Sequence, residues 1–267
     1  MTLADADLAR FETFTLALQA AAAGVILPLF RAEHGVEDKG PAKNGEFDPD
    51  TLADKGAEAE ICRLIAARFP DHGVIGEEYG EDRPDAEFVW LLDPIDGTRA
   101  FICGLPVWTT LIALRHQGRP VVGAIGQAYI GEVFIGSRLG ARVERSHDSR
   151  PLKVRPCAKL GEALIATTDQ NIFKGEDAER WTRMRQAVRL ARYGCDAYAY
   201  AMVAAGALDA VVETGLKSWD IEAAVPVVEG AGGFITHWSG APIGQHGGNL
   251  LIAGDARVRD QAIGVLA

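Results

Sequence analysis

The sequence has few cysteines, and no pattern links them to a metal or to each other. Four cysteines occur in 267 residues, and no two of them have the spacing of a CxxC pair. The six histidines likewise form no HxH or HExxH pair. These absences argue against a disulfide framework and against zinc sites of the usual kinds, and the cysteines are expected to be reduced thiols.

Long hydrophobic runs and an excess of basic charge are also missing. No stretch reaches the roughly 18 uninterrupted apolar residues of a transmembrane helix, and the first 29 residues lack the basic leader region of a signal peptide. Twenty-seven basic against 37 acidic residues give a net charge of -10. This charge argues against nucleic acid or an anionic membrane as a partner, and it would repel an anionic substrate unless cations bridge the two. We therefore expect a cytoplasmic protein.

Hydrophobic spacing predicts two helices, then an antiparallel sheet, then a half in which strands and helices alternate. Polar, Gly- and Pro-rich segments at 34–50 and 73–85 are expected to be exposed loops. The expected elements are helices over 8–30 and 51–68, strands over 88–92, 107–114, 121–125 and 132–136, then strand 163–168, helices near 176–191 and 196–205, strand 209–214, a helix from 220 and strand 250–253. We expect a single catalytic domain over 1–267, with an α+β half to about 145 and an α/β half from about 146.

The stretch "LLDPIDGTRAF", residues 91–101, places two carboxylates at the end of an apolar run. Asp93 and Asp96 are followed by Gly97 and Thr98, whose backbone N–H groups open a short segment suited to a phosphate oxygen. Asp-Pro and Asp-Gly are also common turn chemistry, so an ordinary turn is the alternative. Metal-binding carboxylates beside an anion-binding turn predict metal-assisted hydrolysis of a phosphate ester.

Three more acids fall at the ends of expected elements. Glu77 lies in a tight turn flanked by glycines, Asp54 in the first turn of a helix, and Asp220 at the start of another helix. Hard oxygen ligands without His or Cys partners suit Mg²⁺ or Mn²⁺. The alternatives are a helix cap for Asp220 and a solvated acidic surface around Glu77.

One other class of phosphatase is excluded by spacing. The haloacid-dehalogenase motif D-x-D-x-[TV] uses its first aspartate as a covalent nucleophile and needs a second aspartate two residues later. Here Ile95 occupies that position after Asp93. The chain therefore does not follow that mechanism.

Four motifs in order resemble those of the inositol monophosphatase family. They are "DPDTLAD" at 48–54, "GEE" at 76–78, "WLLDPIDGTRAF" at 90–101 and "WDIEAAVPVVEGAGG" at 219–233. The resemblance covers nearly the whole chain. It implies a layered αβαβα sandwich of mixed α+β and α/β character, a homodimer, a small phosphate monoester as substrate, and a requirement for two or three Mg²⁺ ions per site, with Mn²⁺ as a substitute.

The same resemblance assigns roles to individual residues. It implies metal ligation by the side chains of Glu77, Asp93, Asp96 and Asp220 and by the carbonyl of Ile95, with Asp54 at an outer metal through water. It implies phosphate binding by the N–H groups of Gly97 and Thr98, with Glu77 and Thr98 orienting the attacking water. Lys43 matches a lysine beside the metal loop, although a solvated surface charge is the alternative.

Substrate choice is expected to depend on the segment 192–220. Gly194 is followed by Cys195 and Asp196, where inositol phosphatases have small neutral residues after the glycine, and then by Tyr198 and Tyr200. The stretch resembles the histidinol-phosphatase branch. A carboxylate at 196 suits a cationic substrate, and Glu213 matches a position that contacts the organic part. A helix cap is the alternative for Asp196. We therefore predict histidinol-phosphate phosphatase activity, with inositol-1-phosphate as the alternative substrate and sugar-bisphosphate or adenosine-bisphosphate after it.

Overall fold

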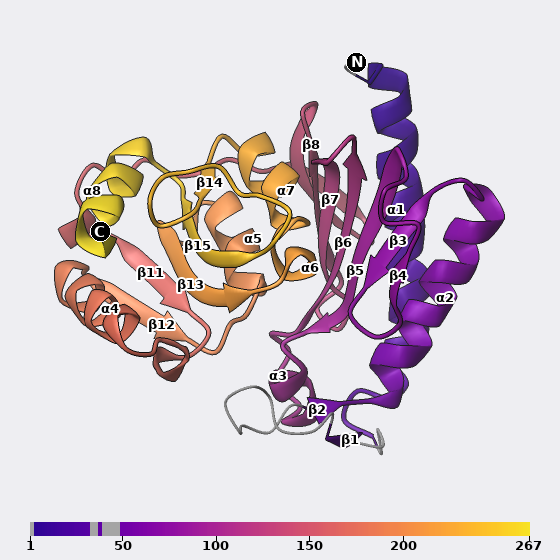
Figure 1. Ribbon diagram of the computed structural model, residues 1–267, viewed down its shortest axis with the longest axis horizontal. Helices are drawn as coiled ribbons and strands as arrows, with labels where there is room; N and C mark the ends of the chain where they lie inside the picture. Colours follow the sequence, from indigo (N-terminus) through magenta and orange to yellow (C-terminus); the bar gives the residue numbers. More distant parts are fainter. Residues whose placement is uncertain (1–2, 33–36, 39–48) are drawn as a thin grey trace.

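The computed structural model describes residues 3–32, 37–38 and 49–267, which form two β-sheets with helices between them and on both outer sides (Figure 1). Five layers follow one another: two helices, a sheet of eight strands, three helices, a sheet of five strands and two helices. The helices of these layers are α1 (Asp5–Ile26) and α2 (Leu52–Arg68), then α5 (Tyr198–Ala204), α6 (Ser218–Ile221) and α7 (Ala224–Gly230), then α4 (Glu176–Ala187) and α8 (Ala256–Leu266). The predicted αβαβα sandwich is confirmed.

The large sheet is antiparallel except at one pair of strands. Its order is β10-β9-β8-β7-β6-β5-β3-β4, and only β3 and β5 run parallel. Its strands are β3 (Gly73–Gly76), β4 (Gly80–Asp82), β5 (Phe88–Asp96), β6 (Thr109–His116), β7 (Arg119–Gln127), β8 (Glu132–Ser137), β9 (Gly140–Arg145) and β10 (Asp148–Pro151). The antiparallel sheet expected after the first two helices is therefore present and extends further than predicted.

The small sheet is mixed. Its order is β12-β11-β13-β15-β14, with β11 parallel to both of its neighbours and β15 antiparallel to both of its own. Its strands are β11 (Leu164–Thr167), β12 (Leu190–Tyr193), β13 (Ala210–Leu216), β14 (Phe234–Thr236) and β15 (Gly248–Ala253). Short elements complete the described chain: β1 (Glu37–Asp38) pairs with β2 (Pro49–Asp50), and α3 (Thr98–Ile102), η1 (Leu160–Glu162) and η2 (Gln170–Ile172) are single turns.

Alternation along β5 shows how the layers bury both faces of the large sheet. Trp90 and Leu92 pack with α1 and α2, whereas Val89 and Leu91 pack with α5, α7 and the small sheet. Successive side chains of a strand point to opposite faces, so a strand that is apolar throughout belongs at the centre of a sheet covered on both sides. β5 is therefore held rigidly where its last residues leave the sheet.

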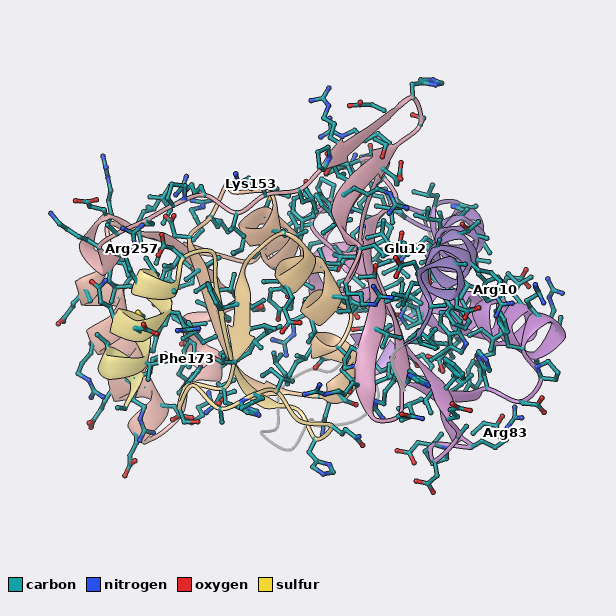
Figure 2. The ribbon with its side chains drawn as sticks, turned by 90° about the horizontal axis from the view of Figure 1, so that it is seen from above. Arg10, Glu12, Arg83, Lys153, Phe173 and Arg257 are labelled. Atoms are coloured by element: carbon teal, nitrogen blue, oxygen red, sulfur yellow. The ribbon has the colours of Figure 1, made fainter. Side chains whose placement is uncertain are left out.

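A third apolar cluster fills the outer layer behind the small sheet. Phe173 stacks on Trp181 of α4 with ring centroids 4.9 Å apart, and Figure 2 shows Phe173 in this outer layer. None of the described helices is long and apolar enough to cross a membrane.

Several predicted elements differ from the structure. Residues 73–85 are not a continuous loop, because Gly73–Gly76 forms the buried strand β3, whose lack of alternation comes from burial on both sides. The helix expected over 176–191 ends at Ala187, and Leu190–Tyr193 forms the edge strand β12. The first helix ends at Ile26 rather than residue 30. Lys43 and most of the expected loop 34–50 lie outside the described residues.

Candidate active site

The end of β5 is bent by an irregularity in its pairing with β6. Asp93 is paired with Leu111 and Asp96 with Thr109, so three steps on β5 match two on β6. Pro94 lies within this bulge, where it has no N–H to donate, and its carbonyl accepts a hydrogen bond from the Thr110 hydroxyl at 2.8 Å. The bulge therefore turns both aspartates to the same end of the sheet.

The chain then passes through a left-handed glycine into a short helix. Gly97 has φ +84°, which a residue with a side chain rarely adopts, and α3 begins at Thr98. The Thr98 hydroxyl donates to the carbonyl of Ile95 at 3.0 Å. The N–H groups of Ala100 and Phe101 donate to the Gly97 carbonyl at 2.8 and 3.0 Å, so it is the N–H groups before Ala100 that are suited to an anion.

Asp93 lies at the centre of a group of carboxylates. It is only 2% exposed, and its Oδ1 has no hydrogen-bond partner among the described residues. Burial raises the pKa of Asp93, and the charges of Glu77, Asp96, Asp220 and Asp54 raise it further. The structure thus brings five acids from distant parts of the sequence close enough to repel one another.

Asp220 and Asp54 both also cap helices. Asp220 accepts a hydrogen bond from the backbone N–H of Lys217 at 2.7 Å through Oδ2. Asp54 accepts from the backbone N–H of Thr51 at 3.0 Å, also through Oδ2. Capping is therefore present at both positions, and because it uses one carboxylate oxygen of each, it does not exclude a second role. Burial raises the pKa of Asp220 to about 7, and Glu77 adds to this.

Asp196 joins the second half of the chain to the loop after β5. Its Oδ2 lies 2.9 Å from the point that a β-carbon on Gly97 would occupy, and the backbone N–H of Ala197 donates to Asp96 Oδ2 at 2.7 Å. Asp196 does not cap α5, whose N-cap is Ala197 and has no side-chain cap. The cap alternative is therefore wrong, and the Asp196 carboxylate lies over the turn predicted to bind phosphate.

Asp196 and Glu213 lie beside the same residue, Thr168. Thr168 donates to Glu213 through its N–H at 2.6 Å and its hydroxyl at 3.1 Å, and its side chain also lowers the pKa of Asp196. Burial raises the pKa of Asp196 to about 6, with Thr168 and Arg99 opposing the shift. Burial likewise raises the pKa of Glu213 to about 8. Both acids therefore lie in poorly solvated surroundings beside the carboxylate cluster.

The remaining predicted substrate residues shape the same turn. Gly194 has φ +75°, and its N–H donates to the carbonyl of Thr168 at 2.8 Å. Cys195 is half-buried, and burial raises the pKa of its thiol. Tyr200 is buried in the core, and Tyr198 donates its hydroxyl to Glu132 at 2.8 Å, so these two tyrosines pack and brace the helix.

The chemistry of the acidic group fits a hard divalent cation. All of its donors are oxygens, and one of them, Asp93 Oδ1, is buried without a partner among the described residues. No three His, Cys, Asp or Glu side chains of the described chain lie close enough to hold a metal ion as they stand. Ligation therefore requires these side chains to rotate inward, which a cation's charge would favour.

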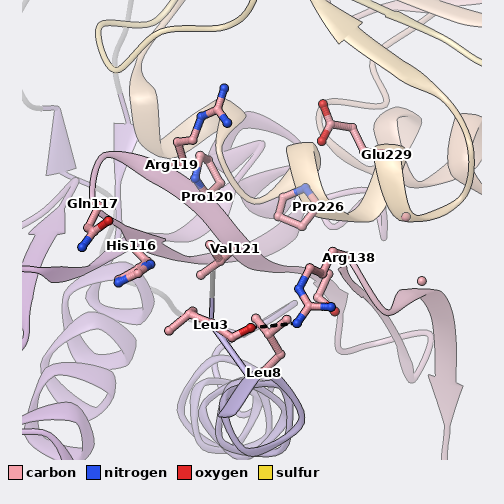
Figure 3. Close-up of a pocket in the computed structure, with 13 residues that line it drawn as sticks. Leu3, Leu8, His116, Gln117, Arg119, Pro120, Val121, Arg138, Pro226 and Glu229 are labelled. Carbon is pink, nitrogen blue, oxygen red and sulfur yellow. Dashed lines mark hydrogen bonds between the residues drawn. The ribbon is translucent and has the colours of Figure 1, made fainter. Parts of the chain in front are cut away.

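A separate pocket of about 560 Å³ lies at the other end of β6 and β7, between the start of α1 and α7 (Figure 3). Its walls include Leu8, Val121 and Pro226, and Arg119 and Glu229 also line it. It contains none of the residues predicted to act on the phosphate ester. The candidate active site is therefore the carboxylate group at the junction of the two sheets.

Two polar residues of this region have no counterpart in the sequence prediction. Thr168 follows β11 in a stretch with no recognisable motif. It hydrogen-bonds Glu213 and lowers the pKa of Asp196. Glu58 lies on α2, four residues after Asp54, and is fully buried. That spacing, which places both acids on one helix face, was the signal available in the sequence.

Comparison with known proteins agrees with this architecture. A model of the inositol monophosphatase family matches residues 7–263. The bifunctional phosphatase IMPL2 of Arabidopsis thaliana, described as chloroplastic, is 39% identical over 271 residues, which cover 98% of this chain and 76% of that protein. The histidinol-phosphatase of Chlorobaculum parvum is 32% identical over 214 residues, covering 79% of this chain and 81% of that one. The solved structure of an inositol monophosphatase from Zymomonas mobilis has a TM-score of 0.84 and 35% identity, covering 96% and 97% of the two chains.

The fold and these matches define a hydrolase of phosphate esters. More narrowly, the chain belongs to the inositol monophosphatase family. Members of this family are metal-dependent phosphatases, generally using Mg²⁺, that act on small phosphate monoesters.

Proposed function

We propose that this chain is a Mg²⁺-dependent phosphomonoesterase that converts L-histidinol phosphate and water to L-histidinol and phosphate. The observation that carries the choice of substrate is the position of Asp196 Oδ2, 2.9 Å from the point that a β-carbon on Gly97 would occupy. A carboxylate this close to a phosphate-binding turn would repel the phosphate of an ester whose organic part is an uncharged polyol. A substrate whose organic part carries a cation would offset this repulsion. The ammonium and imidazole of histidinol phosphate supply that cation.

The proposed mechanism assigns each residue a separate task. Glu77, Asp93, Asp96, Asp220 and the Ile95 carbonyl would hold Mg²⁺, with Asp54 at the edge of the group. When bound, Mg²⁺ neutralises phosphate charge and lowers the pKa of the attacking water.

The other residues orient the reactants. Gly97 and Thr98 hold the phosphate through their N–H groups, and Glu77 and the Thr98 hydroxyl orient the water for attack in line with the leaving oxygen. Asp196 pairs with the cationic end of the substrate, while Glu213 accepts a hydrogen bond from its organic part. No residue is phosphorylated in this scheme.

Inositol 1-phosphate is the second candidate substrate, supported by the likeness to the inositol monophosphatase from Zymomonas mobilis. The single catalytic domain with halves meeting near residue 145, the homodimer and the cytoplasmic location belong to the proposal as well.

A phosphate-release assay with Mg²⁺ separates the two substrates. We expect kcat/KM for histidinol phosphate to exceed that for inositol 1-phosphate by at least about tenfold, the worth of one charge-assisted contact. Asp196→Asn keeps the shape and tolerates the φ of +41° at this position. It should lower kcat/KM for histidinol phosphate about 10- to 100-fold and change inositol 1-phosphate turnover much less.

Glu179→Gln, on the exposed face of the outer helix α4, is the matched control for loss of one negative charge. It should leave both substrates unaffected. A higher kcat/KM for inositol 1-phosphate in the parent chain would overturn the choice of substrate.

A further inference from the structure

Glu58 is a fully buried carboxylate whose partners lie on another element. It extends from α2, one turn after Asp54, and has an exposed fraction of 0%. Burial of a carboxylate is costly unless hydrogen bonds compensate it. The position of these partners therefore indicates what the residue does.

Two backbone amides in the turn between β3 and β4 are among these partners. The N–H of Glu78 donates to Glu58 Oε2 at 3.0 Å, and the N–H of Tyr79 donates to Glu58 Oε1 at 2.9 Å. Immediately before them, the N–H of Glu77 donates to the carbonyl of Leu92 at 3.1 Å. Glu77 is thus fixed by the sheet on one side and by the helix α2, through Glu58, on the other.

Gly76 shows how closely the carboxylate is seated. A β-carbon at Gly76 would lie 1.9 Å from Glu58 Oε1, so the glycine is required for the carboxylate to reach the turn. The first residue of the "GEE" sequence is therefore a glycine because the Glu58 side chain from α2 occupies the space that a β-carbon would need.

We propose that Glu58 is a positioning residue that aims Glu77 at Asp93 and so sets the affinity of the site for a divalent cation. This inference rests on the proposed metal-dependent function. Glu77 lies near enough to Asp93 for its charge to act on that residue, and the turn that follows it is held by the two bonds to Glu58. Residues that orient metal ligands typically change metal affinity or activity by about 10- to 100-fold when replaced.

Titration calorimetry with Mg²⁺ alone tests the inference without any substrate. Glu58→Gln keeps the size of the side chain but presents an NH₂ group to one of two N–H donors. We expect its dissociation constant for Mg²⁺ to rise about 10- to 100-fold. Glu60→Gln, which removes the same charge from a partly exposed position of α2 paired with Arg63, is the control and should bind Mg²⁺ like the parent.

A second variant, at Gly76 of β3, disturbs the same contact between Glu58 and the turn. Gly76→Ala should displace the Glu58 carboxylate and weaken Mg²⁺ binding as well. Because both changes break one contact, their effects in the double variant should fall short of the product of the single effects. Full independence of the two changes would contradict the inference.

Hydrogen exchange in the parent chain needs no variant. The amides of Glu78 and Tyr79 should exchange slowly in the parent and, if Glu58→Gln folds, faster in that variant. Rapid exchange of both amides in the parent, or equal Mg²⁺ affinity of the parent and a folded Glu58→Gln variant, would overturn the role of Glu58. Absence of Mg²⁺ binding to the parent would instead overturn the proposed function itself.

Discussion

His72 is held within a stack of aromatic rings beside the first strand of the large sheet. Its ring stacks on Phe69 at 4.5 Å and on Phe88 at 4.8 Å between centroids. The indole N–H of Trp90 donates to His72 Nδ1 at 3.1 Å, which requires that nitrogen to be unprotonated. Burial lowers the pKa of His72 to about 4, with Asp71 opposing the shift.

The lowered pKa of His72 predicts that the folded protein loses stability in mild acid. The unfolded chain takes up a proton at His72 near pH 6.5, whereas the folded chain resists it down to about pH 4. Because the unfolded state binds more protons in that window, the free energy of unfolding falls as the pH falls through it, by on the order of 1–2 kcal/mol for this partly exposed ring. Urea unfolding at several pH values measures the loss.

Replacement of the ring separates its contribution from that of the carboxylates. His72→Gln does not titrate and keeps an acceptor for Trp90, so it should lose less stability between pH 6.5 and 4 than the parent. His147→Gln, at an exposed turn, should behave like the parent. An equal loss in His72→Gln and the parent would show that the acid sensitivity arises elsewhere.

At the scale of elements, a buried ion pair connects β6 with the joint between α6 and α7. Arg115 donates to Glu222 through Nε at 3.0 Å and through Nη2, and the two side chains are 6% and 2% exposed. The pair therefore links the large sheet to the segment that carries Asp220.

Replacing one partner of this ion pair should lower the free energy of unfolding far more than replacing both partners. Arg115→Met or Glu222→Leu alone leaves an uncompensated buried charge and should lower the free energy of unfolding by about 3–5 kcal/mol. Arg115→Met combined with Glu222→Leu should recover much of that loss. Chemical unfolding of the single and double variants measures it, and additive losses would contradict a direct pairing.

The elements that the sequence predicted well are those with a strong apolar signal. The run that ends in Asp93 reads as a buried strand, and helix α2 begins directly after its cap Thr51, within one residue of the predicted start. The strands β3 and β12 were missed because four residues are too few to show a period, and because β3 is framed by glycines and acids that also suit a loop.

In the candidate site too, the sequence predicted the residues that belong to local motifs and missed those that act through contacts distant in the sequence. The motifs named the acids that the structure brings together around Asp93, but their roles in metal binding stay a prediction. Glu58 and Thr168 were missed because each bonds a segment 20 or more residues away. The spacing of Asp54 and Glu58 places both acids on one helix face, but it does not indicate which segment Glu58 contacts. Contacts of this kind are decided by packing of whole elements.

At the scale of the whole molecule, the candidate site draws on both halves of the chain. Asp93 and Asp96 come from the large sheet and Asp220 from the helices between the sheets, so a bound cation should stabilise the junction. Mg²⁺ at about 100 times its dissociation constant should add about 2.7 kcal/mol and raise Tm by roughly 5–10 °C.

Thermal unfolding with and without Mg²⁺ measures this effect. The rise should disappear with a chelator and in Asp93→Asn, while Asp85→Asn, away from the site, should retain it. A parent chain whose Tm is indifferent to Mg²⁺ would contradict a metal site at this junction.

The borders of the large sheet limit how copies of this chain can associate. One border, β4, is three residues long and exposes Glu81 and Asp82. The other, β10, carries Asp148, Arg150 and Pro151, and a proline has no N–H for a further strand. Short, charged and proline-bearing borders resist the addition of strands and with it the growth of fibrils. A homodimer of this chain would therefore join through faces or helices, and the large sheet would stay eight strands wide within it.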